Sequence, residues 1–149
     1  MILTLFTLVL ALLLRGLGAL GVRALADGRA ATRAAMGLFF CATGTGHFLG
    51  VRADLIAMVP PGFPDPALLV TLSGLAELAG GIGLLLPATA RLAGPALILL
   101  LVVIFPANVH AAREGLLVAG YRHPGLAERG LMQLVWIGML WWSRPRSRR

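Results

Sequence analysis

The sequence predicts an all-α protein built as a bundle of transmembrane helices. Its 149 residues are 58% hydrophobic and only 13% charged, and the mean hydropathy is +0.88. The apolar residues gather in five segments of about the length that crosses a bilayer, roughly 20 residues each. In lipid every backbone amide needs a partner within its own segment, so spans of this length are helices. A chain of this length has room for one compact helical unit.

The five segments differ in how cleanly they predict a membrane span. They run over residues 2–22, 34–51, 67–86, 92–110 and 125–143. The middle three are clear apolar runs. The first contains Arg15, and the last carries Glu128 and Arg129 near its start, where long side chains can reach the aqueous interface.

A cleaved signal peptide is the alternative for the first segment, because Ala24-Leu25-Ala26 resembles a cleavage site. Two observations count against it. No basic residue precedes the apolar core, and cleavage would leave Arg29 and Arg33 outside, at the start of the next span. We therefore expect a transmembrane helix here.

The net charge of +7 comes entirely from arginines that cluster between the apolar segments, which indicates membrane orientation and not nucleic-acid binding. Five alternating spans place eight arginines on one side, namely Arg23, Arg29, Arg33, Arg91, Arg144, Arg146, Arg148 and Arg149. The other side receives Arg52, Arg113, Arg122 and Arg129. The arginine-rich side is expected to be cytoplasmic. This predicts a multi-pass inner-membrane protein with its N-terminus outside and its C-terminus in the cytoplasm.

Glu77 lies near the middle of the apolar run from Pro66 to Pro87. A carboxylate at that depth costs roughly 2.5–3.5 kcal/mol on insertion scales. We therefore expect Glu77 to face the protein interior, to be protonated or paired, and to mark the functional site.

Apart from Arg15, which lies nearer the inner side, the other unusual polar residues fall in the outer half of the predicted membrane and form, with Glu77, the candidate site for a ligand or proton. They are Ser73, His47, Asn108, Gln133 and His110. Each has a structural alternative. The histidines can be interfacial, Asn108 can hydrogen-bond across a helix break at Pro106, and Gln133 can join neighbouring helices.

Small residues predict where helices approach closely. Ala42, Gly46 and Gly50 repeat every fourth residue, while Gly74 and Gly81 lie two turns apart. The loop from Val51 to Pro66 contains four prolines, which predict an extended path over the bundle, either as a lid or as a simple linker.

These motifs resemble those of DoxX-like integral membrane proteins. The resemblance covers residues 33–145 and rests on Gly46-His47-Phe48, Val59-Pro60-Pro61, the run Ser73–Pro87, Phe105-Pro106-Ala107-Asn108 with His110, Gln133, and the ending Trp141-Trp142-Ser143-Arg144-Pro145. It implies a four-helix DoxX-like core over residues 30–149. Residues 1–29 would then be an additional N-terminal transmembrane helix with a cytoplasmic loop.

The resemblance also implies a redox-associated accessory subunit in place of a stand-alone enzyme. A polar pocket would bind a quinone-like ligand or a membrane or periplasmic redox protein. Glu77 would exchange a proton, Ser73 would tune it, and His47, Asn108 and Gln133 would orient the ligand. No metal or other cofactor is predicted.

Three other functions stay open at this point. The protein can be a structural or assembly protein without a ligand. His47, Glu77 and His110 can be metal or haem ligands. A small proton-coupled transporter also suits an acidic residue in the middle of a membrane.

Overall fold

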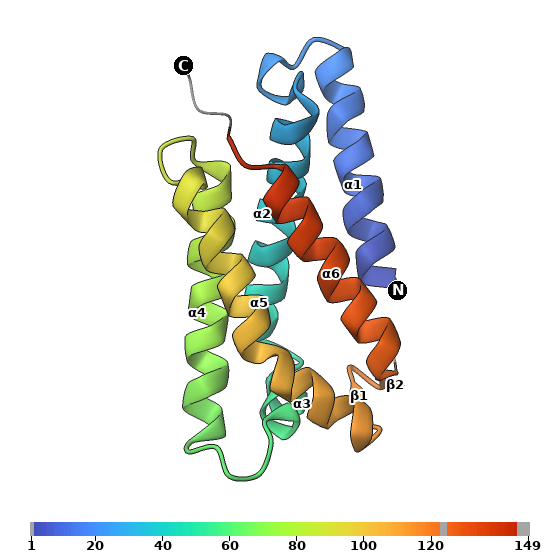
Figure 1. Cartoon of the computed structure of the whole chain (residues 1–149), viewed down its shortest axis with the longest axis vertical. Coiled ribbons are helices and arrows are strands. Elements are labelled where there is room, and N and C mark those ends of the chain that lie inside the picture. Colours follow the sequence, from blue (N-terminus) through green and yellow to red (C-terminus); the bar gives the residue numbers. More distant parts are fainter. Residues whose placement is uncertain (1, 123–124, 146–149) are drawn as a thin grey trace.

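A computed structural model describes residues 2–122 and 125–145 and is helical apart from one short hairpin (Figure 1). The helices are α1 (Ile2–Ala19), α2 (Gly28–Gly46), α3 (Arg52–Met58), α4 (Pro66–Leu85), α5 (Ala90–Arg113) and α6 (Leu126–Trp142), with a 3₁₀ turn at Arg23–Leu25. The strands β1 (Leu117–Val118) and β2 (Tyr121–Arg122) pair antiparallel between α5 and α6. The all-α prediction is confirmed.

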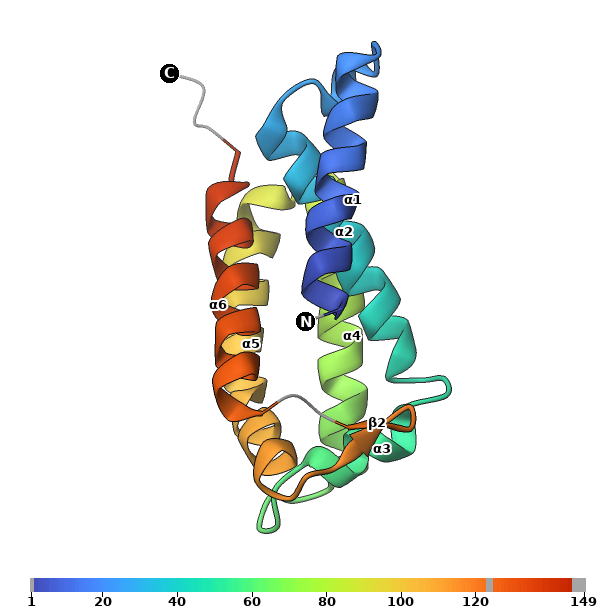
Figure 2. The same ribbon diagram turned by 90° about the vertical axis from the view of Figure 1, so that its right-hand side faces the viewer.

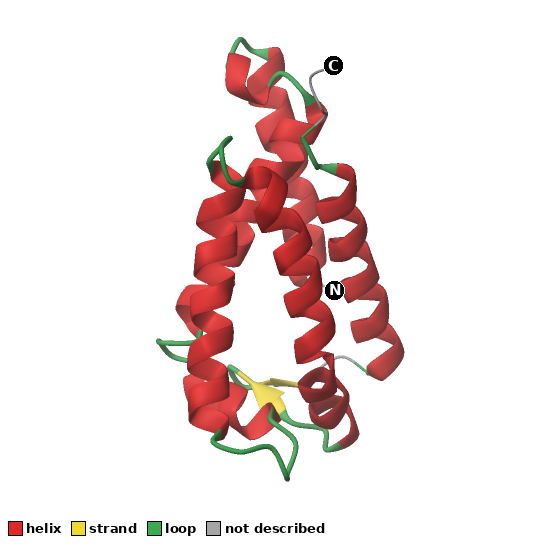
Figure 3. Cartoon of the chain, turned by 60° about the vertical axis from the view of Figure 1, so that its left-hand side comes forward, coloured by secondary structure: helices red, strands yellow, loops and turns green. Residues whose placement is uncertain are grey.

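The long helices lie side by side and enclose a small apolar core (Figures 2 and 3). Helix α4 packs on α2 and α5, α6 packs on α5 and α2, and α1 packs on α2. The core is made of Met36, Phe39 and Phe40 from α2, Leu84 from α4, Ala93, Leu97 and Leu101 from α5, and Leu140 from α6. Burial of these side chains holds the long helices together.

The two ends of the bundle carry different connections (Figure 1). The α1–α2 connection, the α4–α5 turn and the end of α6 lie at one end, which we call the arginine-rich end. Its described arginines are Arg23, Arg29, Arg33, Arg91 and Arg144. Helix α3 and the hairpin lie at the opposite end, which we call the α3 end.

Within the described residues, two helices, α4 and α5, are long and apolar enough to cross a membrane. Helix α1 is apolar over Leu3–Ala19 but shorter. Only 33% of the apolar window of α4 and 17% of that of α5 is buried, so both helices turn most of their surface outward. The outward side chains include Leu68, Leu72, Leu75, Leu99, Val102 and Val103.

Glycines set the close approach of α2 and α4, although not all the glycines that the sequence indicated. A Cβ on Gly74 would lie 2.5 Å from the Cβ of His47, and one on Gly81 would lie 2.8 Å from Cys41 Sγ. From α2, Gly37 and Gly44 face α4 in the same way. Small residues at such crossings let backbones come together.

The predicted contact series Ala42, Gly46 and Gly50 is therefore wrong as a packing face. Ala42 is exposed, and a Cβ on Gly50 would meet nothing within 4 Å. Gly50 instead lies beyond the end of α2 with a φ of +49°, a left-handed conformation that glycine adopts without strain.

The proline-rich loop is also more ordered than predicted. Residues Arg52–Met58 form helix α3, and an extended path begins only at Val59. The reason is positional, because every proline of this loop follows Met58. Helix α5 likewise continues through Pro106 to Arg113, so Asn108 does not lie at a helix end.

Candidate functional site

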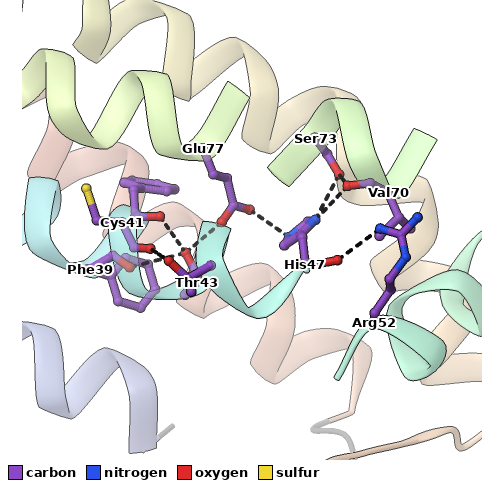
Figure 4. Close-up of polar contacts among 10 residues, drawn as sticks. Phe39, Cys41, Thr43, His47, Arg52, Val70, Ser73 and Glu77 are labelled. Atoms are coloured by element: carbon purple, nitrogen blue, oxygen red, sulfur yellow. Dashed lines mark hydrogen bonds and ion pairs between the residues drawn. The ribbon is translucent and has the colours of Figure 1, made fainter. Parts of the chain in front are cut away.

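His47 and Glu77 meet between α2 and α4, near the middle of α4 (Figure 4). His47 directly follows the last residue of α2, and its Nε2 lies 3.5 Å from Glu77 Oε1. Both residues are buried, with exposed fractions of 8% and 6%. The glycine contacts of Gly44 and Gly74 bring the two backbones close enough for this pair to form.

Thr43 occupies the other oxygen of the carboxylate. Its hydroxyl lies 2.6 Å from Glu77 Oε2, a separation typical of a hydroxyl that donates to a charged oxygen. Thr43 lies four residues before His47, so both side chains leave the same face of α2. The carboxyl group is thus held at both oxygens by one helix.

The second ring nitrogen of His47 faces acceptors on α4. Nδ1 lies 2.9 Å from the carbonyl oxygen of Val70 and 3.2 Å from Ser73 Oγ, and the Ser73 hydroxyl donates to the same carbonyl oxygen at 3.1 Å. A carbonyl oxygen can only accept, so Nδ1 carries a hydrogen. This leaves Nε2 as the nitrogen that changes its protonation.

Nε2 and the carboxyl group face each other, so one proton can lie on either group. With the proton on the ring, an imidazolium faces a carboxylate. With the proton on Glu77, a neutral acid faces a neutral imidazole. Both arrangements are uncharged overall, which suits a buried site because an isolated charge there is costly. The contact of 3.5 Å is longer than an ordinary hydrogen bond.

Arg52 fastens the end of the site nearest α3. Its Nη1 donates to the carbonyl oxygen of His47 at 3.0 Å, and its Nη2 donates to Thr71 Oγ1 at 2.9 Å and to the carbonyl oxygen of Ala67 at 3.2 Å. One guanidinium thus connects the end of α2, the start of α3 and the first turns of α4. It also leaves a positive charge close to the His47–Glu77 pair.

The structure divides the predicted site residues between two places. Glu77, Ser73 and His47 come together, whereas Asn108 lies on α5 and accepts a hydrogen bond from Arg129 Nη1 of α6. Within the described ranges, no hydrogen bond or ion pair joins Gln133 or His110 to either group.

Arg129 differs from the prediction that it reaches water. It is 6% exposed and lies in the first turn of α6. The reason is tertiary: α6 packs on α5 at this level, and Asn108 offers its carbonyl oxygen to the guanidinium.

A metal site at His47, Glu77 and His110 finds no geometric support. Among residues 2–122 and 125–145, no three histidine, cysteine or acidic side chains lie close enough together to hold a metal ion.

Comparison with protein families gives one match. Residues 36–144 match the family described as "Domain of unknown function (DUF8561)". The chain belongs to this family. The matched DUF8561 region runs from the interior of α2 to just beyond α6, and α1 precedes it. No curated protein and no solved structure matches the chain. The resemblance to DoxX-like proteins is not tested by the family match and stays a prediction.

Sequence reasoning missed Thr43 and Arg52. Thr43 had a detectable signal, because it lies one helical turn before His47 on the same face. Arg52 was counted only as an orientation signal, since nothing in its local sequence indicates that it joins α3 to the end of α2 and to α4.

Proposed function

We propose that this DUF8561 protein is a multi-pass, DoxX-like protein of the cytoplasmic membrane, in which the His47–Glu77 pair is a proton-exchanging site of a small redox-associated subunit. The contact of the two buried side chains across the α2–α4 crossing is the observation that carries this proposal.

The outward apolar surface supports the membrane part of the proposal. A core helix of a soluble protein is mostly buried, whereas α4 and α5 are apolar helices with at most a third of their apolar windows buried. Exposed leucines on α1 and α6, such as Leu12, Leu13 and Leu134, extend this surface around the bundle. Soluble proteins avoid apolar surfaces of this extent, but lipid covers them without cost.

The arrangement of the connections supports the proposed orientation. Three chain connections or ends meet at the arginine-rich end, and the α3 end carries Asp54, Asp65 and Glu114 beside its basic residues. The arginine-rich end would be cytoplasmic. Arg144 lies over the ring of Trp141 at 4.3 Å, and such aromatic and basic residues are common at a membrane interface.

The chemistry of the pair supports proton exchange with a quinone-like ligand or a redox partner. Reduction of a quinone consumes protons as well as electrons. The pair can deliver its proton, which leaves it with one negative charge, and the positive Arg52 nearby stabilises that charge. Arg52 lies at the side of the pair that faces the α3 end and holds its backbone in place. The proposal of a redox partner rests on the resemblance to DoxX-like proteins.

The decisive experiment compares Glu77→Gln with Glu114→Gln, which removes an exposed carboxylate at the end of α5. Infrared spectroscopy of the detergent-solubilised protein between pH 5 and 9 is expected to show a buried carboxyl band that the wild type and Glu114→Gln share. Glu77→Gln should lack the band, and should no longer co-purify with the lipophilic molecules or redox proteins that mass spectrometry detects with the wild type. Unchanged co-purification in Glu77→Gln would remove the proposal.

A structural role is the second candidate, and one observation favours it. Both oxygens of Glu77 and both ring nitrogens of His47 already contact groups of the protein. A pair whose polar atoms are all occupied can be a structural link between α2 and α4 that has no further role. In that case Glu77→Gln lowers the thermal stability of the bundle, and the variant co-purifies with the same molecules as the wild type.

A further inference from the structure

A basic hollow opens at the arginine-rich end of the bundle, away from the His47–Glu77 pair. Its volume is about 440 Å³, and its lining consists of Arg29, Arg91, Trp141, Arg144 and Pro145. These residues come from the start of α2, the start of α5 and the end of α6. Three of these residues carry a guanidinium group, and no acidic residue is among them. The space is therefore lined by positive charge.

Two of the arginines are held in place by the end of α6. Arg29 Nη1 donates to the carbonyl oxygen of Trp142 at 2.9 Å, and its guanidinium carbon lies 5.5 Å from the centre of the Trp142 ring. Arg144 lies over Trp141. An arginine has five N–H donors, and those that lie in the guanidinium plane suit the oxygens of a phosphate. The hollow is therefore suited to an oxyanion before any ligand arrives.

A mainly apolar groove of about 640 Å³ has Trp142 in its lining, and Arg29 of the hollow lies 5.5 Å from the centre of that ring. The groove lies between α1, α2 and α6. Its lining includes Leu8 and Leu12 from α1 and Val135 and Met139 from α6, with Arg15 as its one charged residue. Basic and apolar recesses in succession match a molecule that has an anionic head and a hydrocarbon tail.

We propose that this end of the bundle binds one anionic phospholipid, with its phosphate in the hollow of Arg29, Arg91 and Arg144 and an acyl chain in the groove between α1, α2 and α6. This inference rests on the membrane placement proposed above, but not on the His47–Glu77 pair. Basic pockets between helices at the cytoplasmic side of membrane proteins recognise phospholipid head groups in this way.

The apolar groove favours a lipid over free phosphate. A free phosphate would use only the basic hollow, and would leave the leucines and the tryptophan ring of the groove without a role. The position of the site also fits, because Trp141 and Trp142 lie where side chains of this kind meet the lipid head groups. Binding should therefore require both the anionic head and the acyl chain.

The test titrates the full chain in mild detergent with phosphatidylglycerol, phosphatidylcholine or inorganic phosphate, and follows bound species by native mass spectrometry. The variant Arg91→Gln/Arg144→Gln is compared with Arg23→Gln/Arg113→Gln, which removes two exposed arginines that do not line the hollow. Each arginine near an anionic head group contributes about 1 kcal/mol, or roughly fivefold in affinity. The first variant should bind phosphatidylglycerol about 25-fold more weakly, and the second should bind like the wild type.

The outcomes separate the ways in which the inference can fail. Equal losses in both double variants would mean a general effect of charge, and equal binding of the two lipids would mean that no anion is recognised. Saturation by inorganic phosphate that blocks the lipid would assign the hollow to a free anion. If the first double variant unfolds, Arg144→Gln alone should still weaken phosphatidylglycerol binding about fivefold. Release of the wild type from membranes by alkaline carbonate would refute the membrane placement itself.

Discussion

The α2–α4 crossing depends on the absence of a side chain at Gly74, and a single methyl group should open it. In Gly74→Ala, the new Cβ would begin only 2.5 Å from His47 Cβ and 3.0 Å from the ring of Phe48. The Cβ of His47 is fixed to the backbone, so a rotamer change of the ring cannot relieve this contact. The two helices must instead move apart at this level.

The structure sets the size of this movement. Carbon atoms pack at about 3.5–4.0 Å, so relief of the 2.5 Å contact needs a shift of roughly 1–1.5 Å. A shift of that size takes the 3.5 Å contact of His47 with Glu77 beyond the range of an ion pair. Overpacking of this kind costs about 1–3 kcal/mol. For a chain of this length, a loss of 2 kcal/mol lowers the melting temperature by roughly 4–8 °C.

The matched control is Gly138→Ala, because Gly138 also lies inside a helix but a Cβ there would meet nothing within 4 Å. Both changes gain the same helix propensity, roughly 0.5–1 kcal/mol, so the difference between them isolates packing. Thermal unfolding of both variants, followed by tryptophan fluorescence in the same detergent, measures this difference. Equal or higher stability of Gly74→Ala relative to Gly138→Ala would refute the close crossing.

Three further changes test the polar contacts. Thr43→Val should lower the unfolding free energy by about 1.5–3 kcal/mol, because Glu77 loses its hydroxyl donor. Thr43→Ser keeps a hydroxyl and should retain most of the wild-type stability. Equal stabilities of the two variants would contradict this. Arg52→Gln should make the loop after α3 more sensitive to proteases, since three hydrogen bonds are lost; an unchanged digestion rate would show that the arginine does not hold α3. Asn108→Ala should cost about 1.5–3 kcal/mol in chemical unfolding, because the buried Arg129 loses an acceptor; a neutral result would mean that water replaces the amide.

Local sequence was enough to predict the five long helices and to select part of the site. The apolar runs are long and separated by proline, glycine and arginine, so helix type and approximate bounds follow without tertiary information. Glu77 was identified from the free-energy cost of placing a carboxylate in an apolar segment. Such a group needs a polar partner in any fold that the chain adopts. Ser73 lies one turn before Glu77 on the same helix face, and in the structure its hydroxyl lies 3.2 Å from His47 Nδ1.

The partners of these residues were beyond the reach of local sequence. The glycines of α2 that face α4 are Gly37 and Gly44, whereas spacing favoured Gly46 and Gly50, because rotation of a helix about its axis is decided by its neighbours. The same rotation brings Thr43 and His47 to Glu77 and leaves Asn108 with Arg129.

The chain by itself thus determined which long segments are helical, where the arginines collect, and that Glu77 requires compensation. These properties depend on composition and on the periodicity of one helix. Only the tertiary structure decided that His47 and Thr43 supply that compensation, that Arg129 is buried, and that three arginines from distant segments surround one hollow. Those outcomes depend on the depth and rotation at which separate helices pack, and packing is set by contacts between residues far apart in the chain.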